Sequence, residues 1–115
     1  MDDCIFCKII NGEVPTKIEF EDDNFIAFND INPKAKLHIL IIPKKHFDSI
    51  SILRSDDFLM MGELFKVAQR IAAKKAIIDS GYRLIINSGK DAGMAVKHLH
   101  LHLLGGEQLG DLNQS

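Results

Sequence analysis

Three histidines alternate with leucine near the C-terminal end of the chain, in the run His-Leu-His-Leu-His-Leu-Leu at residues 98–104. Side chains of a β-strand point alternately to its two faces, so a strand here would place the three imidazoles on one face and the leucines on the other. Such imidazoles can chelate a metal, supply a nucleophile with proton-transfer partners, or face solvent. The strict alternation favours a functional role over a solvated face.

Two more histidines lie earlier in the chain. His38 opens the apolar segment 38–42, and His46 follows a Pro-Lys-Lys sequence. A single histidine at the start of a buried strand is more often structural than catalytic, and a loop histidine is usually a surface residue. The significance of both depends on whether the fold brings them to the histidine run.

The two cysteines of the chain, Cys4 and Cys7, have the Cys-x-x-Cys spacing of half a zinc site. The same spacing also occurs in redox pairs and in two core thiols. A redox pair usually follows a strand in a βαβ unit, and that setting is absent here. A tetrahedral zinc site would need two more ligands, which His46 and one histidine of the run can supply.

An acidic residue and a glycine-containing loop are candidates for nucleotide contacts. Asp30 lies between Phe28 and Ile31 just before a proline turn, where a carboxylate can cap the turn or accept both hydroxyls of a ribose. Glycines in the loop 87–93 let backbone N–H groups approach a phosphate, although a plain turn explains them equally well. The chain has no GxxxxGK[ST] sequence, which excludes a P-loop.

The elements that must position these residues can be predicted from hydrophobic periodicity and turn residues. A short helix is expected over 4–10, ending at Asn11-Gly12, and strands over 18–21, 25–29, 38–42, 82–86 and 96–104. The longest helix should begin near Ser55 as its cap and end before Ser80-Gly81. Its predicted apolar stripe comprises Phe58, Met61, Leu64, Phe65, Ala68, Ile71 and Ala72. This order predicts an α+β domain with a mostly antiparallel sheet.

Composition bounds the protein class. The 115 residues, 46% apolar and 26% charged, predict one globular domain over 1–115 with a polar tail after residue 106. A net charge of −2 argues against a nucleic-acid coat or a polybasic membrane patch. Residues 1–15 show no signal-peptide pattern, and no apolar run reaches the roughly 20 residues of a membrane helix. A cytoplasmic location is therefore expected.

Taken together, these residues resemble the histidine-triad (HIT) nucleotide-binding family, and within it the Hint-type nucleoside phosphoramidase branch. Residues 98–104 match the pattern His-φ-His-φ-His-φ-φ, in which φ is apolar. Further matching segments, in the same order along the chain, are 4–10, 21–23, 27–33, 38–46 and 102–106. The resemblance implies a HIT-like fold, with an antiparallel five-stranded sheet, one long and one short helix, and a sheet continued across a homodimer.

The resemblance also implies roles for individual residues. His100 would attack the α-phosphorus of a nucleoside 5′-phosphoramidate, and water would hydrolyse the resulting nucleotidyl-histidine to a nucleoside monophosphate. His38 and His102 would contact phosphate oxygens and assist proton transfer. The backbone carbonyl of His98 would hold the tautomer of His100.

The substrate implied by the resemblance is a purine nucleotide. Asp30 would bind the ribose hydroxyls and Asn87 the phosphate. An apolar slot for the base would be lined by Phe6, Ile9, Phe28, Ile31 and Leu40, and Val96 is a further expected contact.

Members of the family with Cys-x-x-Cys point to a structural zinc ion held by Cys4, Cys7, His46 and His98. No organic cofactor, nucleic acid or membrane is expected as a partner.

The chain departs from the phosphoramidase pattern just before the histidine run. It has Gly93-Met94-Ala95-Val96 where that branch usually has Gly-Gln-Ser-Val, and Glu107 where many relatives have Arg. Losing a hydrogen bond to the phosphate or leaving group typically costs about 1–3 kcal/mol. Nucleotide binding should survive this loss, while handling of the leaving group should be weaker or altered.

Three alternatives to a phosphoramidase remain open at the sequence level. The first is hydrolysis of dinucleoside polyphosphates, a sister activity on the same fold. The second is nucleotide binding by a scaffold protein with little catalysis, which the Met94-Ala95 replacement would allow. A metal hydrolase that uses all the histidines as ligands would need a water-activating carboxylate that the sequence does not reveal.

Overall fold

The computed structural model describes residues 4–111, which form one five-stranded antiparallel sheet of order β1-β2-β3-β5-β4. The strands are β1 (Ile18–Glu21), β2 (Phe25–Asn29), β3 (Leu37–Pro43), β4 (Tyr82–Ile85) and β5 (Leu101–Gly105). The helices are α1 (Ile5–Ile10) and α2 (Phe58–Lys74), with 3₁₀ turns at Ile50–Ile52, Ser55–Asp57 and Lys90–Ala92. The predicted α+β architecture, with one long and one short helix, is confirmed.

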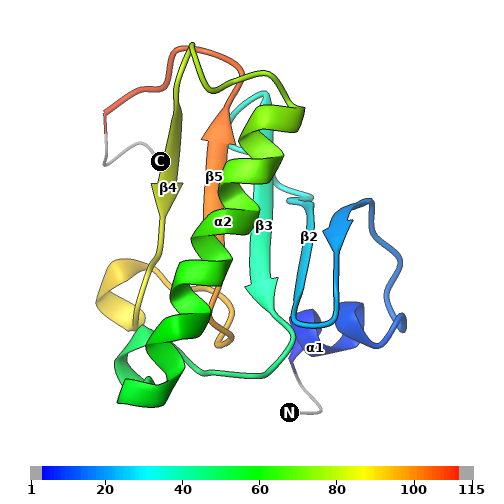
Figure 1. The fold of residues 1–115 in the computed structure, drawn as a ribbon, viewed down its shortest axis with the longest axis vertical. Helices are drawn as coiled ribbons and strands as arrows, with labels where there is room; N and C mark the ends of the chain where they lie inside the picture. Colours follow the sequence, from blue (N-terminus) through cyan, green and yellow to red (C-terminus); the bar gives the residue numbers. More distant parts are fainter. Residues whose placement is uncertain (1–3, 112–115) are drawn as a thin grey trace.

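The sheet separates two apolar clusters. The long helix α2 runs along one face of the sheet, across β3 and β5 (Figure 1). Its buried side chains pack there against alternate residues of β3 and β5, including Ile39, Ile41 and Leu103. The short helix α1 packs against the other set of alternating residues, with Phe6 and Ile9 in its cluster. The face beside α2 therefore forms the larger part of the core, and the face beside α1 carries the candidate site.

The tight turn between β1 and β2 follows the prediction from its polar residues. The Asp22 carboxylate accepts the backbone N–H groups of Asn24 and Phe25, at 2.8 and 2.7 Å. This Asx-type turn reverses the chain and brings β2 back against β1.

The fifth strand is shorter than predicted, because β5 begins at Leu101 instead of residue 96. Its ladder with β3 starts at the pair Ile41–Leu101, and Leu99 donates its N–H to the carbonyl of Phe47 instead. Pro43 ends β3 and has no N–H with which to extend the ladder. The alternation of side chains nevertheless continues ahead of the strand, since Leu99, Leu101 and Leu103 are all buried in the cluster under α2.

The start of the long helix also differs from the prediction. Ser55 opens a 3₁₀ turn and does not cap α2, which begins at Phe58 and ends at Lys74. The Asp57 carboxylate accepts the N–H of Arg54 at 2.8 Å and so holds the entry to the helix.

Two members of the predicted apolar stripe of α2 are exposed. Phe58 and Phe65 are 54% and 45% exposed, whereas Met61, Leu64, Ala68, Ile71 and Ala72 are buried as predicted, together with Val67. At 100° per residue, Phe58 and Phe65 lie about 80–100° around the helix axis from the middle of the buried stripe. They therefore flank the stripe and do not reach the sheet.

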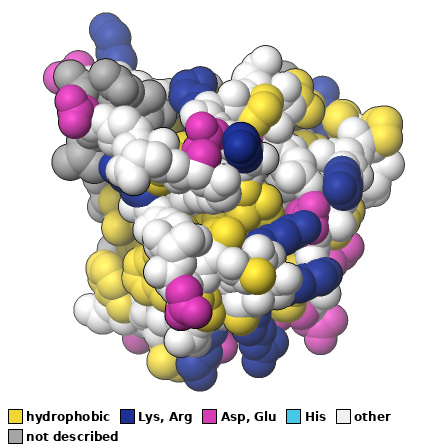
Figure 2. Space-filling model, turned by 90° about the horizontal axis from the view of Figure 1, so that it is seen from above, with side chains coloured by type: hydrophobic (Ala, Val, Ile, Leu, Met, Phe, Trp, Pro, Cys, Tyr) yellow, Lys and Arg dark blue, Asp and Glu magenta, His cyan; other side chains and the backbone are white. Residues whose placement is uncertain are grey.

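Charges of both signs are interspersed over the face of the molecule seen in Figure 2, with hydrophobic side chains between them. That distribution agrees with the near-neutral net charge. Within residues 4–111, no helix is long and apolar enough to span a membrane.

Candidate active site

A cavity of about 690 Å³ opens on the side of the sheet that carries α1. Every residue predicted to contact substrate lines it. These residues are Phe6, Ile9, Phe28, Asp30, Ile31, Leu40, Asn87 and Val96, together with the histidines His38, His100 and His102. Residues from four separate stretches of sequence thus meet at one place, as the resemblance implies.

His100 is held so that one ring nitrogen faces the cavity. The backbone carbonyl of His98 lies 2.7 Å from His100 Nδ1 and accepts its proton. Nε2 therefore keeps its lone pair, and the residue is 95% buried at the cavity wall with 5% exposure. Burial lowers the pKa of His100, so the ring is neutral at pH 7. A neutral imidazole with a free, directed lone pair is a competent nucleophile.

His38 and His102 form a hydrogen-bonded pair that begins at a backbone amide. The N–H of Lys34 donates to His38 Nδ1 at 3.0 Å, so the proton of His38 sits on Nε2. That Nε2–H points at His102 Nδ1, 2.9 Å away. By this chain of hydrogen bonds His102 carries its own proton on Nε2, the nitrogen left to donate to a ligand.

Desolvation dominates the electrostatics of this pair. Burial lowers the pKa of His38, and burial together with the neighbouring His100 and His38 lowers the pKa of His102 to about 4. Asp30 opposes both shifts, with its carboxylate 3.5 Å from His38 Nε2. At neutral pH the imidazoles therefore act as hydrogen-bonding groups and not as cations.

An apolar wall stands beside the imidazoles. The ring of Phe6 makes edge-to-face contacts with Phe28 and His100, with centroids 5.5 and 5.1 Å apart. Ile31 stands at the rim of the cavity and is 87% exposed. An exposed apolar residue at the lip of a cavity is suited to cover the flat face of a bound ring.

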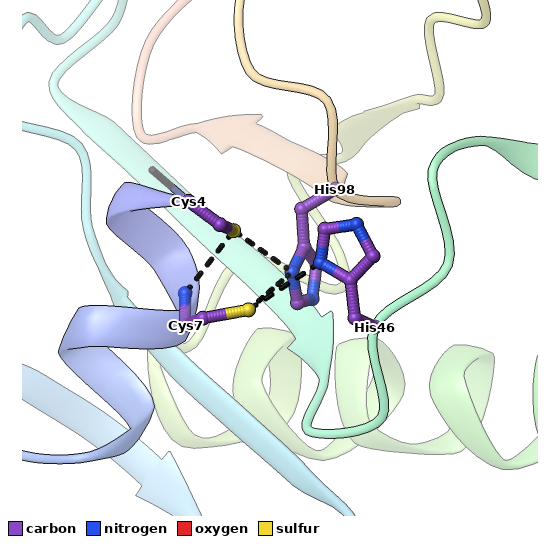
Figure 3. Close-up of side chains that lie close together, drawn as sticks. All are labelled: Cys4, Cys7, His46 and His98. Carbon is purple, nitrogen blue, oxygen red and sulfur yellow. Dashed lines mark hydrogen bonds between the residues drawn. The ribbon is translucent and has the colours of Figure 1, made fainter. Parts of the chain in front are cut away.

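A second cluster lies at the N-terminal end of α1 (Figure 3), and none of its four residues lines the cavity. Cys4 and Cys7 project from α1 and its N-cap toward His46, which follows β3, and His98, which precedes β5. Their ligand atoms all lie within 4.8 Å of one another. The sulfur-to-nitrogen distances are 3.3 Å for Cys4–His98, 3.3 Å for Cys7–His46 and 3.6 Å for Cys7–His98.

The donor set and its geometry fit a tetrahedral zinc ion. Thiolate and imidazole ligands of one zinc ion lie about 3.6 Å apart, from the usual bond lengths. Both histidines present Nδ1, because His98 Nε2 donates to the Pro43 carbonyl and His46 Nε2 to Asp48, at 2.9 and 2.8 Å. Such outer hydrogen bonds orient metal-binding imidazoles. Burial and the adjacent Cys4 raise the pKa of Cys7 to about 11, a shift that a bound divalent cation reverses.

The side chain of His98 belongs to the metal cluster, whereas its backbone carbonyl accepts a hydrogen bond from His100. Its imidazole is fully buried and does not line the cavity, so it has no side-chain contact with the predicted substrate space. The regular strand predicted over all three histidines is shorter in the structure, since β5 begins at Leu101. The imidazoles of His98 and His100 nevertheless both lie on the side of α1, where each contacts Phe6. His98 faces the cysteines there, whereas His100 and His102 line the cavity.

Some cavity residues were missed by the sequence analysis. They include Val14, Pro15, Thr16, Lys34 and Ile85. The sequence gives a partial signal for Lys34, since this residue lies in the proline turn that leads into His38. Ile85 gave no signal, because its contact with the site depends on the pairing of β4 with β5.

Comparison with known proteins decides the family. A family model described as "Scavenger mRNA decapping enzyme C-term binding" matches residues 3–114. A histidine triad protein from Clostridium difficile superposes with a TM-score of 0.94 at 45% identity, over 96% of each chain. The chain belongs to the histidine-triad (HIT) family. An uncharacterized HIT-like protein from Chlamydia trachomatis is 45% identical over 94% of this chain and 96% of its own length.

Other HIT structures carry titles that describe activity or binding. A HIT family hydrolase from Legionella pneumophila has a TM-score of 0.91 and 44% identity, over 94% of this chain and 96% of its own. A histidine triad nucleotide-binding protein from Candida albicans has a TM-score of 0.77 and 33% identity, over 95% of this chain and 85% of its own.

Proposed function

We propose that this HIT protein hydrolyses nucleoside 5′-phosphoramidates of purine nucleosides through a nucleotidyl-His100 intermediate. The observation that carries the proposal is the hydrogen bond between His100 Nδ1 and the His98 carbonyl, which leaves Nε2 free at the cavity wall. The Legionella and Candida relatives, titled a hydrolase and a nucleotide-binding protein, support the reaction class.

The first step would transfer the nucleotide to the enzyme. The lone pair of His100 Nε2 forms a bond to the α-phosphorus as the P–N bond to the amine breaks. The departing nitrogen needs one proton, which His102 Nε2 would give while a proton from solvent enters the hydrogen-bonded His38–His102 pair, so that neither ring is left as an anion. Asp30 would hold the ribose hydroxyls while the apolar wall covers the base.

The second step would release the nucleotide. A water molecule would attack the phosphorus as the bond from phosphorus to His100 Nε2 breaks, and one proton of the water would leave to solvent through the His38–His102 pair. The products are the free amine and the nucleoside monophosphate, and both imidazoles regain their starting protonation. Splitting the reaction in this way replaces one difficult displacement by two easier ones.

In this proposal the metal cluster would have a structural role. Cys4, Cys7, His46 and His98 would hold a zinc ion, which supplies a cross-link between α1 and the segment before β5. Its contribution to the reaction would be indirect, through the position of the His98 carbonyl that fixes His100.

The test is a mass measurement. During turnover of a slowly reacting phosphoramidate, intact-mass analysis should show an adduct equal to one nucleoside monophosphate less water. His100→Ala should lose both the adduct and turnover while keeping its thermal unfolding temperature and its binding of AMP. Full turnover by His100→Ala would overturn the mechanism.

A second candidate function is nucleotide binding with slow chemistry. Ala95 lines the cavity where the phosphoramidase branch usually has serine, so a hydroxyl donor is missing from the wall. Tight AMP binding with negligible single-turnover chemistry would favour this candidate. A comparison of kcat/KM on phosphoramidates and dinucleoside polyphosphates would separate it from hydrolysis of P–O–P bonds.

A further inference from the structure

The cavity contains very little charge for a site that would bind a phosphate. Among the described residues 4–111, its lining includes two charged side chains, Asp30 and Lys34. The Asp30 carboxylate already accepts the N–H of Asn32 at 2.8 Å and lies 3.5 Å from His38 Nε2. It also carries the same sign as a phosphate, so it cannot favour one.

The hydrogen-bonded imidazoles of His38 and His102 do not supply the missing positive charge. His38 Nδ1 accepts the N–H of Lys34, and His102 Nδ1 accepts the Nε2–H of His38, so each ring carries one proton and no charge. Neutral imidazoles can donate hydrogen bonds to phosphate oxygens but leave its charge uncompensated. Moving an anion from water into a largely apolar cavity is costly unless a cation accompanies it.

Lys34 is the residue that can compensate this charge. The ion pairs between described residues leave the Lys34 ammonium without an acidic partner. Its backbone N–H is anchored to His38 Nδ1 at 3.0 Å, so the residue is fixed beside the imidazole pair. The ammonium charge also acts on both His38 and His102, where it helps to keep the rings neutral.

We propose that Lys34 is a specificity-determining residue whose ammonium group pairs with the substrate phosphate and makes this cavity selective for anionic over neutral nucleosides. The inference rests on the proposed function for the identity of the ligand as a nucleotide. In this proposal one residue of the turn before β3 supplies the positive charge that the neutral histidines cannot provide. Because Lys34 is exposed to solvent at the cavity mouth, its effect should be sensitive to salt.

Lys36 offers a matched control in the same turn. It carries the same charge two residues away but does not line the cavity, and its backbone N–H donates to Glu107 on the outside of the protein. A general loss of positive charge from this surface would affect both lysines equally. A specific contact with phosphate would affect Lys34 alone.

The experiment measures binding of AMP and of adenosine, which lacks the phosphate, by titration calorimetry. At about 0.02 M KCl we expect Lys34→Gln to weaken AMP binding by about tenfold and to leave adenosine binding unchanged. Lys34→Arg should remain within about threefold of the wild type, and Lys36→Gln should match it. The difference between the wild type and Lys34→Gln should shrink markedly at about 0.5 M KCl, where charges are screened over a few ångströms.

Several outcomes would overturn the proposal. Equal AMP affinity of the wild type and Lys34→Gln at low salt would show that the ammonium makes no contact. An equal loss of adenosine binding would show damage to the cavity and not loss of a phosphate contact, and an equal loss in Lys36→Gln would show a general field effect.

The same proteins separate this proposal from the proposed function. If the wild type binds AMP in a Lys34-dependent way but turns over no phosphoramidate, the hydrolase assignment fails and the role of Lys34 stands. If the wild type hydrolyses phosphoramidates and Lys34→Gln leaves KM unchanged at low salt, the role of Lys34 fails alone. If the wild type binds no AMP, both fail.

Discussion

At the scale of single residues, a hydrogen bond to one nitrogen of each imidazole decides what the other nitrogen can do. The His98 carbonyl accepts a hydrogen bond from His100 Nδ1–H, which leaves the lone pair of Nε2 free for the proposed attack. The N–H of Lys34, acting through His38, leaves His102 with a proton on Nε2 to donate. The Pro43 carbonyl leaves His98 with Nδ1 for a metal. Under the proposed function, three histidines from one short run would therefore have three different chemical roles.

The buried state of His102 predicts a pH dependence of stability. Its pKa is about 4 in the folded protein and about 6.5 in an unfolded chain, so the unfolded chain binds more protons between these values. The contribution of neutral, buried His102 to the free energy of unfolding is about 1–3 kcal/mol. It is fully present above about pH 6.5 and is lost as the pH falls toward 4. His100, His38, Asp30 and Lys34 face this ring and set its environment.

The measurement is chemical denaturation of the wild type and His102→Gln between about pH 4 and 7. Contributions shared by both proteins, including any from the metal cluster, cancel in the difference. The wild type should lose more stability than the variant on acidification. Parallel pH profiles would contradict the neutral, buried state of His102.

At the scale of elements, the short helix α1 depends on contacts beyond its own backbone. It has six residues, fewer than an isolated helix needs to be stable in water. Phe6 and Ile9 anchor it through the apolar cluster, and Cys4 caps it by accepting the N–H of Cys7 at 3.2 Å. The cysteines also face His46 and His98, so a zinc ion would join α1 to the loop after β3 and the segment before β5.

Removal of zinc should therefore loosen this end of the molecule. We expect a chelator to lower the Tm of the purified protein by at least about 5 °C, and added zinc to restore it. Cys7→Ser should show a similarly lowered Tm that the chelator no longer changes, because the site is already broken. A Tm that is insensitive to the chelator in a protein shown to contain zinc would contradict the structural role.

At the scale of the whole molecule, the sheet has two edges with different characters. The edge strand β1 pairs with β2 through an irregular register between Ile18 and Phe20, which distorts this edge. The other edge strand, β4, pairs regularly with β5 and exposes Leu84. Irregular edge strands resist pairing with further strands, whereas regular apolar ones favour it. The homodimer implied by the family resemblance is therefore expected to join the sheets at β4.

Sedimentation velocity tests this expectation. The wild type should sediment with twice the chain mass of 12.9 kDa. Leu84→Lys should shift it toward monomer, because a charge would enter the apolar junction. Ile18→Lys places the same charge at a residue of similar exposure on β1, 42% against 37%, and should leave the dimer intact. A dimer lost in Ile18→Lys and kept in Leu84→Lys would place the junction at the other edge.

Local sequence was sufficient for most elements of this fold. Alternation, turn residues and apolar stripes predicted four of the strands nearly to the residue, because each depends on neighbours in the chain. The leucines at 99, 101 and 103 made their burial predictable even where the strand is absent. The resemblance then brought the substrate-binding candidates together, and all of them line one cavity.

What tertiary structure decided depends on contacts between distant residues. The end of the ladder at Leu101 follows from Pro43, which lies far earlier in the chain, and the exposure of Phe58 and Phe65 follows from which side of α2 faces the sheet. The tautomers of the imidazoles depend on carbonyls and amides that only folding brings within about 3 Å. The distribution of charge in the cavity also depends on the fold, because burial keeps His38 and His102 neutral while Lys34 beside them stays exposed. Residue types and their spacing were therefore enough to predict the candidate site residues. Only the folded chain decides which nitrogen of each imidazole is hydrogen-bonded and which is free.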